Sequence, residues 1–232
     1  MKTSDKIKQR LIEADAKYWA SDNIADYMDE GDSEKLIEEL VPEFENVLDG
    51  LIIDRHNDPN SQGTARRLAK MYIYELMSGR YQPRPTVTSF PNEGSERFEG
   101  MLVVRAEITS MCSHHHQTIR GLVHIGYVVD EDGRVIGLSK LNRIVELFAR
   151  RGAIQEQLTS AIHNAVDTIC ENNKGVIVTV VATHNCVSCR GVKHNGASMV
   201  TTKASGVFME NENLARKEFF DSLKINNGGH NI

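Results

Sequence analysis

Apolar residues recur every three or four positions through the first third of the chain, a spacing that predicts amphipathic helices. Helices are expected over residues 4–53, with a break and a possible helix cap at residues 31–33. A polar loop is expected over 54–63, and a third helix carries its apolar stripe on residues 65–76. The stripes contain Ile7, Leu11, Ala14 and Tyr18; Leu36, Leu40, Phe44, Val47 and Leu51; and Ala65, Leu68, Ala69, Tyr72, Ile73 and Leu76.

The pattern changes after an extended connector that contains Pro83, Pro85 and Pro91. Apolar and polar residues then alternate over 101–109 and 119–129, which predicts two strands, and Asp130–Gly133 is expected to form the turn after the second.

Helical spacing returns over residues 138–148 and 154–170, and the second helix is expected to end at Asn172–Gly175. A β-branched strand is expected over 176–182, and a last helix near 212–223. The predicted order along the chain is helices, two strands, two helices, one or two strands and a helix. This order is typical of an α+β fold with a largely antiparallel sheet.

The composition narrows the class of protein. The chain has 232 residues, of which 40% are hydrophobic and 25% charged, so it can bury a core. Its net charge of −5 and pI near 6.0 argue against non-specific binding of nucleic acid. No apolar run approaches the length of a membrane span. The four cysteines follow no export signal, so reduced thiols and a cytoplasmic location are expected.

Potential metal ligands gather in two separate segments. Cys112 and His115 follow a predicted strand end at a spacing that lets one tight turn aim both at a single ion. Cys186, near the end of a later strand, supplies a third ligand. Two thiolates and an imidazole suit zinc, and three protein ligands leave a fourth position for water, as in hydrolytic zinc sites.

A closed structural zinc site is the alternative, because Cys189 forms a C-x-x-C with Cys186. If the strand continues through this segment, the two thiols point to opposite faces and cannot share an ion; a tight turn would remove that objection. The extra imidazoles of His114 and His184 favour the open site. Spacing leaves both arrangements possible.

Basic residues occur at positions suited to a polyphosphate. Two pairs stand three residues apart on predicted helices and so share a helix face, and a fifth cation follows Cys186 by four positions. Solvated helix faces are the alternative, and the sequence does not show that the five converge. The residues are Arg67, Lys70, Lys140, Arg143 and Arg190.

Gln155 and Glu156 stand at a predicted helix start. A carboxylate there ordinarily complements the helix dipole, but it can also accept hydrogen bonds from the N–H edge of a purine.

Taken in order, these motifs resemble those of the type I GTP cyclohydrolases, from about residue 35 to residue 224. The metal-ligand and acid–base candidates lie in segments 112–115 and 184–191, and Lys140 and Arg143 lie in segment 135–151. Segments 64–72 and 155–159 begin predicted helices. The matching segments are 64–72, 112–115, 135–151, 155–159 and 184–191.

The resemblance implies the tunnelling fold, an antiparallel sheet with helices packed on one face. It implies five subunits closing a barrel, two pentamers forming a homodecamer, and active sites at subunit interfaces. It also implies zinc on Cys112, His115 and Cys186, with Cys189 not a ligand. Residues 1–63 then form an N-terminal helical extension, and residues 64–232 the catalytic domain.

The resemblance also assigns roles. His114 and His184 match acid–base histidines, and Gln155 and Glu156 match a pair that recognises guanine. The positions around the ribose and triphosphate are matched by Ser139, Lys140, Arg143 and Arg190, with charge added by Arg67 and Lys70.

The implied reaction is the zinc-dependent conversion of GTP to formate and 7,8-dihydroneopterin triphosphate, from which folate, biopterin and deazaguanine routes begin. The chain departs from the family pattern at Ser113, Ala65 and His116-Gln117, where Glu, Pro and an aromatic residue are usual. The alternative is a protein of this fold that acts on another purine or pterin nucleotide, or binds one without turnover.

Overall fold

A computed structural model describes residues 1–95, 97–210, 212 and 214–226. By packing, the chain divides into two compact units. The first contains residues 1–84 and 150–152, and the second residues 85–149 and the described part of 153–232. The predicted boundary after residue 63 falls inside the first unit, because the helix that follows it packs against the helix before it.

The first unit is helical, as the apolar spacing predicts. Its core joins residues from both sides of the polar loop, including Ile7, Leu36 and Ile73. Its elements are α1 (Thr3–Glu13), η1 (Ala25–Tyr27), α2 (Asp32–Gly50), α3 (Thr64–Lys70), the π-helical η2 (Met71–Leu76) and α4 (Ser78–Tyr81).

The prediction that residue 18 continues the first helix is wrong. The helix α1 ends at Glu13, and Tyr18 lies in irregular backbone with 41% of its surface exposed. Tertiary contacts hold this segment instead. The guanidinium of Arg80 donates hydrogen bonds to the carbonyl oxygens of Tyr18 at 3.1 Å and Asp22 at 3.0 Å, and also to that of Trp19. Such long-range bonds leave no periodic signal in the sequence.

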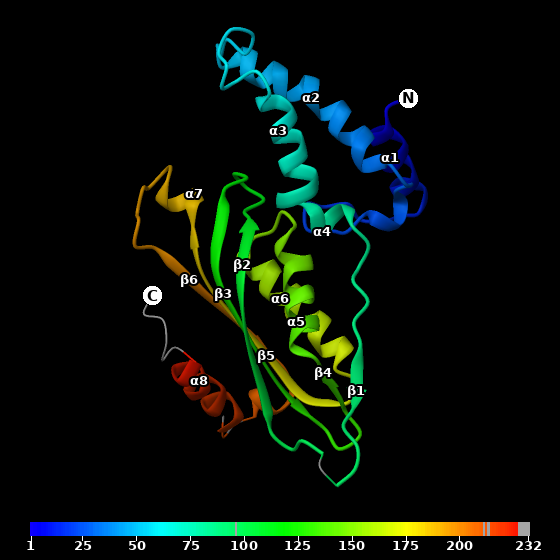
Figure 1. Ribbon diagram of the computed structural model, residues 1–232. Helices are drawn as coiled ribbons and strands as arrows, with labels where there is room; N and C mark the ends of the chain where they lie inside the picture. Colours follow the sequence, from blue (N-terminus) through cyan, green and yellow to red (C-terminus); the bar gives the residue numbers. More distant parts are fainter. Residues whose placement is uncertain (96, 211, 213, 227–232) are drawn as a thin grey trace. The chain divides into compact units, whose positions relative to one another are not determined.

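The second unit is built on a four-stranded antiparallel sheet in the order β2-β3-β5-β6 (Figure 1). The predicted strands are confirmed within a few residues. The sequence pattern predicted one or two strands after the helices of this unit, and the structure has two, β5 and β6. A two-stranded ribbon of β1 (Ser89–Pro91) and β4 (Arg134–Ile136) lies apart from it. The sheet strands are β2 (Met101–Met111), β3 (Thr118–Val129), β5 (Asn173–His184) and β6 (Ser198–Ala204).

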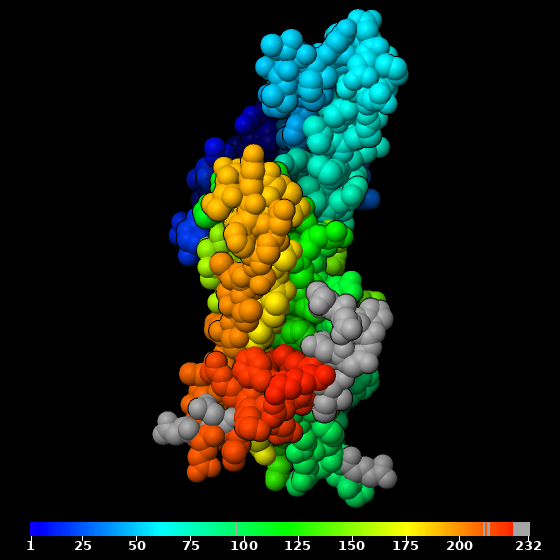
Figure 2. Space-filling model, turned by 90° about the vertical axis from the view of Figure 1, so that its left-hand side faces the viewer, coloured from blue at the N-terminus to red at the C-terminus, as the bar shows by residue number. Residues whose placement is uncertain are grey.

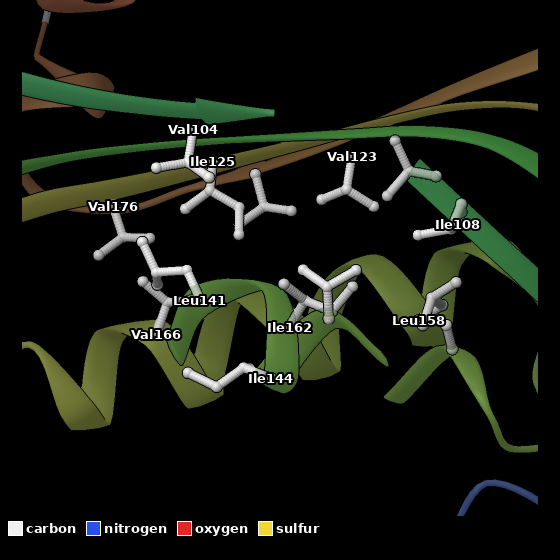
Figure 3. Packing of buried hydrophobic residues seen from close by; sticks show 14 of the residues in the cluster. Val104, Ile108, Val123, Ile125, Leu141, Ile144, Leu158, Ile162, Val166 and Val176 are labelled. Carbon is white, nitrogen blue, oxygen red and sulfur yellow. The ribbon is translucent and has the colours of Figure 1, made fainter. Parts of the chain in front are cut away.

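Two helices cover one face of this sheet, as predicted: α5 (Leu138–Ala149) and α6 (Gln155–Ile169). Alternate strand residues such as Val123 and Ile125 meet helix residues such as Leu141 and Ile162, and all four are fully buried (Figure 3). The alternation along the strands therefore sets which face holds the main core.

The C-terminal segment packs on the opposite face. Here lie η3 (Gly206–Met209) and α8 (Leu214–Asn226); α8 is labelled in Figure 1 and is the red segment at the front of Figure 2. Their residues Phe208 and Phe219 form a buried cluster with Ile177 of the sheet. None of the helices in the described residues has both the length and the apolar character needed to span a bilayer.

A pair of leucines on α5 tests this packing. Leu141 is fully buried and Leu138 is 59% exposed. Replacing Leu141 with Ala leaves a cavity, so Leu141→Ala is expected to lower the free energy of unfolding by about 2–5 kcal/mol. Leu138→Ala is expected to change it by less than about 0.5 kcal/mol. Urea unfolding followed by circular dichroism measures both, and equal effects would contradict the assigned core.

Candidate active site

The strand register brings two distant segments to the same end of the sheet. The strand β3 pairs with both neighbours, so that Met111 lies opposite Thr118 while His184 lies opposite Ile119. The end of β2 and the end of β5 therefore flank the start of β3, although they are about seventy residues apart in sequence.

A tight turn presents the first two candidate ligands. The amide of Cys112 donates to the carbonyl of Gln117 at 2.8 Å, and the amide of His116 donates to the carbonyl of Cys112 at 2.9 Å. The backbone of His116 is left-handed, with φ of 50°. The turn exposes His114 and His115, whose rings meet edge-on with centroids 6.2 Å apart, while Cys112 itself is buried.

The third ligand comes from a short helical turn. The extended backbone stops at His184, and α7 (Asn185–Ser188) carries Cys186 beside the start of β3 (Figure 1). The argument from a continuing strand, which set Cys186 and Cys189 on opposite faces, is therefore wrong.

Among the described residues, Cys112, His115 and Cys186 form a group that could hold a metal ion, because their donor atoms all lie within 4.8 Å of one another. The exposed Cys189 is not part of this group.

This donor set fits zinc. Zinc–sulfur and zinc–nitrogen bonds of about 2.0–2.3 Å in a tetrahedron place ligand atoms about 3.4–3.8 Å apart, and the donor atoms here lie within 4.8 Å of one another. Burial and the neighbouring Cys112 thiol raise the pKa of Cys186, and the positive charge of Arg190 opposes that rise. A bound cation overcomes such a barrier, because it stabilises the thiolates that coordinate it.

His184 stands two residues before Cys186, and its side chain makes a hydrogen bond of 2.7 Å between Nε2 and Oε1 of Gln155. Burial lowers the pKa of His184, and the carboxylate of Glu156 partly offsets this effect. The imidazole is therefore largely neutral near pH 7, a state in which it can accept a proton.

The two residues at the start of α6 differ sharply. Glu156 is exposed, whereas Gln155 is fully buried and its side-chain amide is engaged within the protein. The sequence does not reveal the partners of Gln155, which include Thr201 and lie on two strands of the sheet.

The residues of α5 that were predicted to bind the ribose and triphosphate lie away from the candidate metal group of the same chain. Arg143 borders a hollow with residues 105–107 of β2, about 16–23 Å along that strand from Cys112. Leu141, next to Ser139 and Lys140, packs near Val176, which is at the far end of β5 from His184 (Figure 3). Within the second unit of one chain, Arg190 therefore lies near the candidate metal group, whereas the residues of α5 lie far from that group.

Comparison with known proteins agrees with these motifs. Residues 42–224 match the family model described as GTP cyclohydrolase I. The chain belongs to the GTP cyclohydrolase I family. This confirms the predicted resemblance, the class of enzyme and the predicted fold class.

Relatives named GTP cyclohydrolase 1 occur in several bacteria. The protein of Aeromonas hydrophila is 38% identical over 195 residues, covering 83% of this chain and 86% of its own length. The protein of Actinobacillus pleuropneumoniae is 42% identical over 182 residues, covering 78% and 81%. A solved structure, an apo archaeosine synthase QueF-like protein, shares 18% identity over 46% of this chain and 93% of its own, with a TM-score of 0.38, which is too slight to bear on the fold.

In the present chain, two of the candidates for phosphate binding lie in the first unit. Arg67 and Lys70 are both exposed on α3, three residues apart. The guanidinium of Arg67 donates to the carbonyl of Asn60 at 2.7 Å and to Oγ1 of Thr64 at 3.0 Å. Both cations are accessible to an anion.

Removal of single thiols tests the metal group. Cys112→Ala and Cys186→Ala each delete one of three ligands, so each is expected to reduce bound zinc from about one ion per chain to near zero. Cys189→Ala, which removes a thiol outside the group, is expected to retain the ion. Metal analysis after dialysis measures this, with circular dichroism to confirm folding. Loss of zinc in Cys189→Ala would instead establish the closed four-ligand site.

Proposed function

We propose that this protein converts GTP to 7,8-dihydroneopterin triphosphate with release of formate. The observation that supports this most directly is the group of three potential ligands, Cys112, His115 and Cys186, in a chain of the GTP cyclohydrolase I family. A closed site would have no free position for a reactant.

The three ligands would hold zinc, which would supply Lewis acidity and so lower the pKa of a bound water to about 7. The remaining work falls to the chain. His114 stands next to the proposed ligand His115 on an exposed turn. From there it can give a proton to the guanine base when water attacks C8 of that base. His184, largely neutral near pH 7, can take a proton in the later steps at the sugar.

Recognition of the nucleotide is assigned to groups of opposite charge. The exposed carboxylate of Glu156, close enough to affect the pKa of His184, would accept hydrogen bonds from the N–H edge of guanine. Cations would bind the triphosphate, since guanidinium forks and ammonium charges both suit phosphate oxygens. These are Arg67, Lys70, Lys140, Arg143 and Arg190, with Ser139 near the ribose.

The distance between α5 and the metal group within one chain supports a site shared between subunits. If Arg143 lies about 16–23 Å along β2 from Cys112, it reaches a nucleotide at that zinc best from a second copy of the chain. We therefore propose a homo-oligomer. The family resemblance makes a decamer of two pentamers the proposed form, and the acidic composition supports a cytoplasmic protein without nucleic-acid or membrane partners.

An assay of the purified protein with GTP tests the reaction. Release of formate and appearance of a fluorescent pterin after oxidation are expected, and removal of zinc with a chelator is expected to abolish both. Tight GTP binding with no formate would overturn the proposal and favour a protein that binds nucleotide without turnover.

Mixed oligomers test the shared site. Cys186→Ala and Arg143→Ala subunits are each expected to be inactive alone, but coexpression is expected to restore about a quarter of wild-type activity, because random mixing leaves that fraction of sites with both residues intact. Formate release per total subunit is the measurement.

The matched control mixes Arg143→Ala with Lys140→Ala subunits. Both residues lie on α5 of one chain, so every site then carries one defect, and no recovery is expected. Absence of recovery in both mixtures would place the whole site within a single chain and contradict the shared arrangement.

A further inference from the structure

The side chain of Gln155 is held from several directions inside the protein. Although it is the first residue of α6, it is fully buried and reaches between β5 and β6. Its Nε2 lies 3.1 Å from the carbonyl oxygen of Val180, 3.1 Å from that of Met199 and 3.1 Å from Oγ1 of Thr201. A nitrogen with two hydrogens therefore faces three acceptors.

These partners fix which way the amide points. Turning it over would put its oxygen against two backbone carbonyl oxygens, which cannot donate, and would leave both carbonyls without this partner. The orientation of a buried amide is decided by such neighbours. Here Val180 and Met199 both require the nitrogen.

Two threonine hydroxyls agree with this orientation. Thr159 donates from Oγ1 to the backbone carbonyl of Gln155 at 2.8 Å, which uses its hydrogen. Its contact of 2.6 Å with Oγ1 of Thr201 must therefore be donated by Thr201. With its own hydrogen so used, Thr201 can only accept from the amide of Gln155. The hydroxyl hydrogens of Thr159 and Thr201 then each have one acceptor, and the two amide hydrogens of Gln155 are shared among three.

The remaining atom of the amide, Oε1, can only accept, and it lies 2.7 Å from Nε2 of His184. We infer that Gln155 is a positioning residue that fixes His184 as the tautomer protonated at Nε2, so that Nδ1 is the nitrogen that exchanges protons with the substrate. The part of this inference that concerns the reaction rests on the proposed function, whereas the tautomer rests on the hydrogen bonds alone.

The consequence for chemistry is a defined direction of transfer. A proton taken by His184 arrives at the lone pair of Nδ1, giving an imidazolium whose Nε2–H still donates to Gln155. The same proton leaves again from Nδ1, which restores the original tautomer. A guanine contact by the side chain of Gln155, which the resemblance implies, would require the network to be broken.

Solid-state ¹⁵N NMR of histidine-labelled, zinc-loaded protein reads the tautomer directly. The His184 signals are assigned by their loss in His184→Asn. In the wild-type protein the hydrogen is expected on Nε2. In Gln155→Met, which keeps the length of the side chain but removes its acceptor, a mixture of both tautomers is expected. A wild-type hydrogen on Nδ1 would overturn the inference.

Kinetics separate positioning from substrate contact. Gln155→Met is expected to lower kcat for formate release by about ten- to a hundred-fold, the usual effect of losing a partner that orients an imidazole, while the Kd for GTP changes less than about two-fold. A weaker Kd with an unchanged His184 spectrum would make Gln155 a guanine contact and refute the inference.

Variants of two neighbouring threonines test the hydrogen-bond network without changing Gln155 itself. Thr201→Val removes one of the three acceptors of the Gln155 amide. Because Val180 and Met199 still require the nitrogen, the hydrogen is expected to stay on Nε2 of His184, with a small change in the chemical shift of its signals. Thr202→Val removes a hydroxyl from the same strand, but that hydroxyl pairs with Thr179 at 2.9 Å on the opposite face, and no shift is expected. Equal shifts in both would contradict the network. If wild-type protein released no formate, the proposed reaction would fail, but the tautomer measurement would still stand.

Discussion

The pairing of β3 with both β2 and β5 is the constraint on which the candidate site depends. It holds the ends of two long strands side by side, so that a turn after β2 and a helical turn after β5 face one another. The main core on one face of the sheet stabilises this register, because a slip by one residue would turn the buried side chains to the other face. The placement of the candidate metal group thus follows from the packing of this core, to which Cys112 itself belongs.

Two histidines close to these candidate ligands in sequence have very different surroundings. His114 is exposed on a turn, while His184 is partly buried and hydrogen-bonded. Their environments differ as the environments of acid and base partners commonly do in enzymes. The exposed Glu156 and the fully buried Gln155 show the same contrast within two consecutive residues of α6.

Much of this could be predicted from sequence where the signal is local. Alternation identified β2 and β3, helical spacing identified α5 and α6, and the order of the cysteine and histidine motifs indicated both the ligands and the family. The four residues of α7 are too few for any periodicity, so the reason given for excluding Cys189 was wrong, although the group does exclude it. The partners of Gln155 and the hold of Arg80 on Tyr18 are contacts between distant segments, which no local pattern records.

The strand β6 forms one border of the sheet, and its first residues, 198–200, are exposed. Yet Met199 and Thr201 on this strand help to hold Gln155. Fraying of a border strand is among the least costly motions of a folded protein. Within a single chain, fraying would release two partners of the Gln155 amide and so loosen the imidazole of His184, while Cys112, His115 and Cys186 lie on other elements. A neighbouring subunit that covered this border would therefore also steady the imidazole.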